Sequence, residues 1–130
     1  METKKVVLAI DDNPVQLKLF EEMLVPRYDL RAVKSASDAL HFLNKAGLNS
    51  IDIILLDIEM PNVSGFEFLT DIRRIPRYFH VPIIIVSGNT SQDFLVTAKN
   101  SDANDVLIKP VTAEKLVESI DKALEASAKK

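Results

Sequence analysis

Two patterns of apolar residues alternate along the chain. Continuous apolar runs occupy residues 6–10, 53–56 and 82–86. The runs are rich in β-branched side chains and contain no alternating polar residues, which is typical of strands buried on both faces and therefore of a parallel sheet. Residues 28–33 and 105–108 are weaker strand candidates. The pattern predicts five strands.

Helical patterns with start signals lie between the strands. Asn13 precedes Pro14, a pair suited to a helix cap and first turn, and Leu17, Phe20 and Leu24 then share one face. This predicts a helix directly after the first strand.

Caps and breakers predict the second and third helices. Ser37 is expected to cap a helix that runs to Ala46, where Gly47 stops it. Ser64 and Glu67 have capping-box spacing and predict a third helix, which a proline at position 76 ends.

The last two helices are predicted in the same way. Thr90 or Ser91 should begin a fourth helix that ends near residue 100, and Thr112 should cap a fifth. Residues 126–130 are expected to be frayed. The cluster of Arg73, Arg74 and Arg77 is interpreted as a solvated helix end.

Five strand–helix units in succession imply right-handed crossovers onto a parallel sheet with helices on both faces. Five strands are too few for a closed eight-stranded barrel. The fold class predicted is therefore α/β, an open, doubly wound (βα)5 sheet, in one domain over residues 1–130.

Composition narrows the function. The 130 residues carry a net charge of -3, and the chain lacks a basic run apart from its last two lysines, so we expect no nucleic-acid partner. The chain has no cysteine, which excludes disulfides, thiol catalysis and cysteine-based zinc sites. The apolar run near the N-terminus is too short for a signal peptide or membrane span, and we expect a cytoplasmic protein without a membrane partner.

Chemically useful side chains follow the strands. Asp11 and Asp12 come after the first strand, Asp57 after the third, Ser87 at the end of the fourth and Lys109 after the fifth. The carboxyl ends of parallel strands form one edge, where open α/β sheets bind ligands. We therefore expect these five side chains to meet.

Three close carboxylates repel one another, and a hard cation such as Mg²⁺ relieves that repulsion. Lys109 and Ser87 could then contact the oxygens of a phosphoryl group. The turn after the first strand reads DDNP and is no glycine-rich phosphate loop, which disfavours a flavin or dinucleotide site.

These motifs resemble those of the response-regulator receiver domains of two-component signalling, single-domain regulators included, over nearly the whole chain. The resemblance is carried by Asp11-Asp12, Asp57 in LLDIEMP, Gly65 after MPNVS, Ser87 in IIIVSG and Lys109-Pro110 in VLIKP. It implies the flavodoxin-like strand order 2-1-3-4-5.

The resemblance also implies a metal set. Asp12 and Asp57 would ligate Mg²⁺ together with the backbone carbonyl of Glu59, and Asp11 would hold a metal-bound water.

The reaction implied by the resemblance centres on Asp57 as phosphoacceptor. Asp57 would take a phosphoryl group from a phosphohistidine, Ser87 and Lys109 would grip that group, and water would later hydrolyse it. Such a protein catalyses its own phosphorylation and dephosphorylation without turning over a separate substrate. The family holds the Lys109–Pro110 peptide cis.

The partners implied are a histidine kinase or histidine phosphotransfer protein, docked near Asn13, Pro14, Val15 and Pro110, and an unknown downstream protein. We expect a stand-alone receiver that signals by contact or passes the phosphoryl group onward. It would be a monomer or a weak, phosphorylation-dependent dimer.

The chain departs from the family pattern at three places. Val106 stands where receivers usually carry Tyr or Phe, which puts the usual coupling of Ser87 to the output face in doubt. Asp102 replaces a usual glycine. Glu59 and Asn89, two residues beyond Asp57 and Ser87, are expected to tune the lifetime of the phosphorylated state.

Two other functions compete with this interpretation. The site could be vestigial, leaving a binding module that acts independently of phosphorylation. The DIE segment at residues 57–59 also superficially resembles the motif of aspartate-nucleophile phosphatases, but that class needs an acid–base Asp and a longer chain with a cap.

Overall fold

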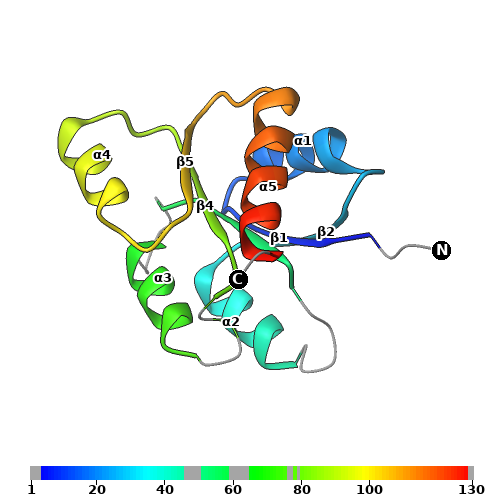
Figure 1. The fold of residues 1–130 in the computed structure, drawn as a ribbon, viewed down its shortest axis with the longest axis horizontal. Helices are drawn as coiled ribbons and strands as arrows, with labels where there is room; N and C mark the ends of the chain where they lie inside the picture. The colour runs from blue at the N-terminus through cyan, green and yellow to red at the C-terminus, as the bar shows by residue number, and fades with distance from the viewer. Residues whose placement is uncertain (1–3, 46–50, 59–64, 76–77, 79, 129–130) are drawn as a thin grey trace.

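The computed structural model describes residues 4–45, 51–58, 65–75, 78 and 80–128. Strands and helices alternate throughout (Figure 1). The strands are β1 (Val6–Ile10), β2 (Asp29–Val33), β3 (Ile53–Leu56), β4 (Ile83–Ser87) and β5 (Asp105–Ile108). The helices are α1 (Pro14–Leu24), α2 (Ala36–Lys45), α3 (Gly65–Arg73), α4 (Gln92–Lys99) and α5 (Ala113–Ala128).

The five strands form one parallel sheet in the order β2-β1-β3-β4-β5. This confirms the predicted architecture and strand order. The order reverses direction at β1 and β3, so the edge beyond these two strands is the topological switch point, where such sheets bind ligands.

Alternate side chains of the central strands build a core on each face of the sheet. Leu8, Ile54 and Ile85 point to the face covered by α2, α3 and α4. Val7 and Ile84 point to the face covered by α1 and α5. Figure 1 shows α1 and α5 together on one side of the sheet, with α2 and α3 on the other. Burial on both faces explains why these runs lack polar alternation.

Several predicted caps are confirmed. Oδ1 of Asn13 accepts a hydrogen bond from the backbone N of Val15 at 2.9 Å, and Pro14 occupies the first turn of α1. Ser91 caps α4 through the N of Phe94. Thr112 caps α5, since its Oγ1 accepts from the N of Lys115. Each side chain satisfies an amide that has no partner within its helix.

The cap of α2 was assigned to the wrong serine. Oγ of Ser35 accepts from the N of Asp38 at 3.0 Å, and the carbonyl of Ser35 accepts from the N of Ala39. Ser37 lies inside the first turn. The sequence offers two serines two positions apart, and the backbone geometry selects the earlier. The predicted signals Gly47, Ser64 and Pro76 lie outside the described residues.

Two boundaries also differ from expectation. Helix α5 continues to Ala128 where fraying was expected from residue 126, and Leu124 and Ser127 remain half-buried one turn apart near its end. Strand β4 begins at Ile83, one residue after the start of the predicted run, and ends as expected at Ser87, which pairs with Ile108 of β5. None of the described helices has both the length and the apolar composition needed to cross a membrane.

Candidate functional site

The sheet delivers four predicted side chains to one edge. Asp11 directly follows β1, Asp57 follows β3, Ser87 ends β4 and Lys109 follows β5. Backbone pairing continues past the strands and fixes these positions: the N of Asp57 donates to the carbonyl of Ile10 at 2.9 Å, and the N of Lys109 donates to that of Ser87 at 2.8 Å. The ladder thereby sets the spacing of the site.

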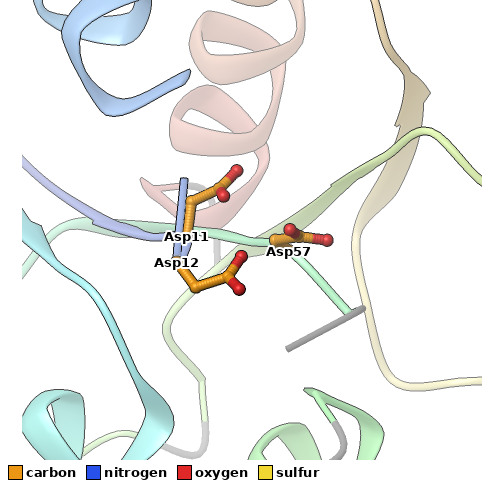
Figure 2. A group of neighbouring side chains, drawn as sticks. All are labelled: Asp11, Asp12 and Asp57. Carbon is orange, nitrogen blue, oxygen red and sulfur yellow. The ribbon is translucent and has the colours of Figure 1, made fainter. Parts of the chain in front are cut away.

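The carboxylates of Asp11, Asp12 and Asp57 converge at this edge (Figure 2). One ligand oxygen from each lies within 4.8 Å of the others. Asp11 and Asp57 are 1% and 7% exposed, whereas Asp12 is exposed to solvent. Two buried carboxylates and one exposed carboxylate are an all-oxygen donor set, which suits Mg²⁺. The residues present therefore fit a magnesium ion.

Lys109 supplies positive charge to the cluster. Its Nζ lies 2.9 Å from Oδ2 of Asp11 and 3.5 Å from Oδ2 of Asp57. Burial is the largest single influence on the pKa of Lys109 and lowers it, but the hydrogen bond to Asp11 and the charges of Asp57 and Asp11 together outweigh burial. The pKa of Lys109 is therefore raised, and the side chain is a permanent cation at neutral pH.

Asp11 is held from two sides. Oδ1 accepts a hydrogen bond from the backbone N of Asn13 at 2.9 Å, and Oδ2 accepts from Lys109. The sequence indicated Asn13 as a cap of α1, but gave no signal that its amide fixes a site carboxylate. Local side chain–backbone bonds of this kind depend on the turn that follows the strand.

Ser87 is fully buried, and its Oγ accepts a hydrogen bond from the N of Asn89 at 3.2 Å. Oδ1 of Asn89 in turn accepts from the N of Ser91, the cap of α4. The hydroxyl at the end of β4 is thus joined to the first turn of α4. The sequence placed Ser87 at this edge but did not indicate the link to the helix.

Gly65 allows α3 to begin against the chain that carries Asp57. A Cβ at this position would lie 2.5 Å from Cα of Ile58 and 3.0 Å from the carbonyl oxygen of Asp57. The N of Gly65 donates to the carbonyl of Ile58 at 3.1 Å. Only glycine permits this close approach of two backbone segments.

Three further predictions concern the Lys109–Pro110 peptide, Val106 and Glu59. The Lys109–Pro110 peptide is cis, and so is Val25–Pro26, which the sequence did not indicate. Val106 is half-buried and packs against the core beneath α2, α3 and α4. Glu59, expected to offer a backbone carbonyl to the metal, lies outside the described residues.

Fold and site together define a doubly wound α/β protein with an acidic, lysine-bearing site at the switch point of its sheet. The model of the response regulator receiver domain family matches residues 7–121. The chain belongs to this family, and it is a phosphoacceptor domain of two-component signalling.

Relatives share this domain in different settings. The chain is 32% identical over 127 residues to a 3',5'-cyclic-nucleotide phosphodiesterase of Dictyostelium discoideum, covering 95% of this chain and 16% of the relative. It is 30% identical to a probable methanogenesis regulatory protein of Methanothrix harundinacea, covering 92% of this chain and 81% of the relative. The chain spans only 16 to 23% of the length of three of its curated relatives.

A solved structure supports the fold. A response regulator receiver domain protein from Clostridium thermocellum superimposes with a TM-score of 0.84 at 29% identity, covering 95% of this chain and 97% of the other.

Proposed function

We propose that Asp57 accepts a phosphoryl group from a phosphohistidine of a histidine kinase or histidine phosphotransfer protein. An oxygen of Asp57 forms a bond to phosphorus as the phosphorus–nitrogen bond of the donor breaks, leaving an acyl phosphate on the chain, and with a proton from solvent the donor imidazole becomes neutral histidine. Water later attacks this phosphorus, releases inorganic phosphate and restores the carboxylate. The protein thereby catalyses the gain and the loss of its own phosphoryl group.

One observation carries the proposal: one carboxylate oxygen from each of Asp11, Asp12 and Asp57 lies within 4.8 Å of the other two, beside the ammonium of Lys109. Phosphoryl transfer depends on positioning and on charge neutralisation more than on covalent help. A bound Mg²⁺ would neutralise charge on the phosphoryl oxygens. The three carboxylates, with the carbonyl of Glu59, are the residues proposed to hold it.

The other side chains of the site are proposed to have distinct roles in binding the metal and the phosphoryl group. Both oxygens of Asp11 already accept hydrogen bonds, from Asn13 and Lys109, which suits a contact to the metal through water. Exposed Asp12 is suited to direct ligation. Lys109 can turn from Asp11 toward a phosphoryl oxygen, and the Ser87 hydroxyl is proposed to donate to a second oxygen.

The donor is proposed to dock on the start of α1 next to the site. Val15 is 67% exposed in the first turn of this helix, beside the loop that carries Asp12. One relative is named as a sensor kinase/phosphatase of Vibrio cholerae, which supports a kinase as the donor. Val15→Asp should slow transfer from the donor, whereas Val96→Asp, at an exposed valine of α4, should not; equal rates in both variants would argue against this docking surface.

Onward transfer or contact with a downstream protein would complete the pathway. Val106 cannot provide the large ring movement that a Tyr or Phe offers at this position, and this favours a relay role over an aromatic-coupled output face.

The experiment that tests the function is incubation with Mg²⁺ and a small acyl phosphate donor, followed by intact-mass measurement. The proposal expects one added phosphoryl group, lost on standing, and none in Asp57→Asn or without the metal. The competing view, a binding module with a vestigial site, expects no added mass in any sample, and that result would favour it.

A further inference from the structure

Helices α3 and α4 border a groove of about 440 Å³ on the side of the molecule away from α1 (Figure 1). A second hollow of about 400 Å³ shares Phe66 and Thr70 with the first and extends along α3 past Glu67 and Asp71. The volume of the first hollow is in the range of sites that hold a ligand or a partner's side chains. We call the two together the α3–α4 groove.

Both helices contribute apolar side chains to the α3–α4 groove, beside the uncharged polar residues Thr70, Thr97, Asn100 and Ser101. Phe66 and Leu69 line it from α3, and Val96 lines it from α4 with 48% of its surface exposed. The ring of Phe66 packs against that of Phe94, with centroids 6.0 Å apart, which holds the two helices at this spacing. An exposed valine opposite a phenylalanine ring offers an apolar contact to a partner.

The charged residues that line the α3–α4 groove are acidic. Among the described residues, the charged side chains that line it are Glu67, Asp71 and Asp102, with no Lys, Arg or His. The guanidinium of Arg73 binds the carbonyl of Asp102, so Asp102 has a positive neighbour outside the lining. Glu67 and Asp71 are exposed on α3, four residues apart on the same side of that helix.

We propose that the α3–α4 groove docks an amphipathic segment of a partner protein, with apolar side chains on one face and lysines or arginines beside them. A helix laid between two helices with its apolar face inward is a recurrent mode of peptide recognition. The acidic side chains that line the groove select a basic partner and repel nucleic acid and anionic membranes. The surface is separate from the start of α1, where the phosphoryl donor is proposed to dock.

Both walls of the α3–α4 groove are joined to the site. Phe66 follows Gly65, which packs on the backbone of Asp57 and Ile58. On the other wall, a chain of hydrogen bonds runs from Ser87 through Asn89 and Ser91 to the N of Phe94. We therefore expect phosphorylation to change the affinity of the groove; this part rests on the proposed function, because it requires Ser87 to turn toward a phosphoryl oxygen.

A synthetic helix with leucines on one face and lysines on the other is a suitable probe. Its affinity can be measured by fluorescence anisotropy, and its site by amide chemical shifts. The pair Glu67→Lys and Asp71→Lys should weaken binding by about tenfold or more, because two favourable charge contacts become repulsive. Val96→Asp should weaken it similarly.

The matched control is the pair Glu114→Lys and Glu22→Lys, which reverses two negative charges elsewhere on the surface. Glu114 is a first-turn acid of α5, as Glu67 is of α3, and Glu22 is an exposed acid of α1. The control pair and the groove pair therefore change the net charge by the same amount and place a lysine in the first turn of a helix in the same way. Neither control residue lines the groove. Leu19→Asp is the control for Val96→Asp.

The proposal requires that only the groove variants weaken binding and that shift changes gather on α3 and α4. An equal loss of affinity in the control pair would mean that the probe is attracted to any acidic surface of the protein, and this would overturn the proposal. Self-association of the chain that Val96→Asp abolishes would overturn it too, since the occupant would then be a second copy.

Phosphorylated and unphosphorylated protein should differ several-fold in affinity for the probe. Confirmed phosphorylation by mass with unchanged affinity would refute the coupling and leave the proposed function intact. Absence of phosphorylation would refute the proposed function, and the binding comparison of the groove variants would still stand on its own.

Discussion

The Nζ of Lys109 lies 2.9 Å from Oδ2 of Asp11, so two residues 98 positions apart in the chain form an ion pair at the edge of the sheet. The carboxylate of Asp11 is 1% exposed and the lysine side chain 21%. A buried carboxylate needs a compensating charge. In the absence of metal, Lys109 supplies that charge, and a bound cation would share the task.

Replacing Lys109 by Met should destabilise the metal-free protein by about 1–3 kcal/mol at neutral pH, because Asp11 and Asp57 lose their cation. The folded pKa of Lys109 is raised above the ordinary 10.5. Its contribution is therefore fully present below that value and is lost as pH rises through the folded pKa. Urea unfolding of both proteins from neutral to alkaline pH measures the difference.

The difference in free energy of unfolding between wild type and Lys109→Met should become smaller as the pH rises above 10.5, the ordinary pKa of lysine. Burial also raises the pKa of Tyr28, so both proteins lose stability in this range, and only their difference is informative. Lys18→Met, at an exposed position of α1, should have little effect. A difference in unfolding free energy that stays constant with pH would contradict the ion pair between Lys109 and Asp11.

Mg²⁺ should stabilise the wild type by ordinary ligand linkage, about 2.7 kcal/mol at a concentration one hundred times the dissociation constant. Asp12→Ala should remove most of this effect, because it deletes an exposed ligand without opening the core. Lys109→Met should bind Mg²⁺ more tightly, since it removes a competing cation. Thermal unfolding with and without Mg²⁺ measures all three.

Glu22→Ala provides the matched control for the metal, since it removes an exposed carboxylate far along α1 from the site. Equal stabilisation of wild type and Asp12→Ala by Mg²⁺ would place the metal elsewhere.

The substitution Gly65→Ala should destabilise the fold by about 1–3 kcal/mol, because the new methyl group overlaps the backbone. The overlap is with Cα of Ile58, at 2.5 Å. Phosphorylation should slow as well, since Asp57 adjoins this contact. Gly88→Ala is the control: a Cβ there meets nothing within 4 Å, and the change should stay within about 0.5 kcal/mol. Equal unfolding free energies for the two variants would contradict the close approach.

Arg73 joins α3 to the segments that precede β4 and β5. Nη1 donates to the carbonyl of Val81 at 2.6 Å, and Nη2 donates to the carbonyl of Asp102 at 2.9 Å. Arg73→Ala should destabilise by about 1–3 kcal/mol, because two backbone carbonyls lose their charged donor. Arg73→Lys should retain only part of the stability that Arg73→Ala loses, since an ammonium cannot reach both carbonyls as a planar guanidinium does.

The neighbouring Arg74 is exposed, so Arg74→Ala should leave the urea midpoint nearly unchanged. A similar shift in the midpoint for both arginines would show that the contacts of Arg73 contribute little.

The sequence was sufficient to predict the centre of the sheet because β1, β3 and β4 are buried on both faces, whereas the edge strands β2 and β5 are partly exposed and gave weaker signals. Runs such as residues 53–56 have no polar residue to confuse strand with surface helix, and their order follows from the family resemblance. Boundaries were harder. Ser35 and Ser37 are equally good caps by type, and the choice depends on where α2 meets the sheet.

The site was predictable in outline because parallel strands end at one edge. The partners within the site were not. Nothing in the sequence indicates that Lys109 pairs with Asp11 or that Asn13 donates its amide to the same carboxylate, because both depend on loop geometry. Arg73 was interpreted as part of a solvated helix end, and this was wrong: its guanidinium donates to the carbonyls of Val81 and Asp102, which only the folded chain brings within reach.

The most direct test of the account locates the modified atom. After incubation with Mg²⁺ and a small acyl phosphate donor, borohydride reduction converts an aspartyl phosphate to homoserine, which peptide mass spectrometry can place in the chain. We predict homoserine at position 57 alone, and none when Mg²⁺ is withheld. Homoserine at position 11 or 12, or none at all despite donor and metal, would contradict the assignment of Asp57 as the phosphoacceptor.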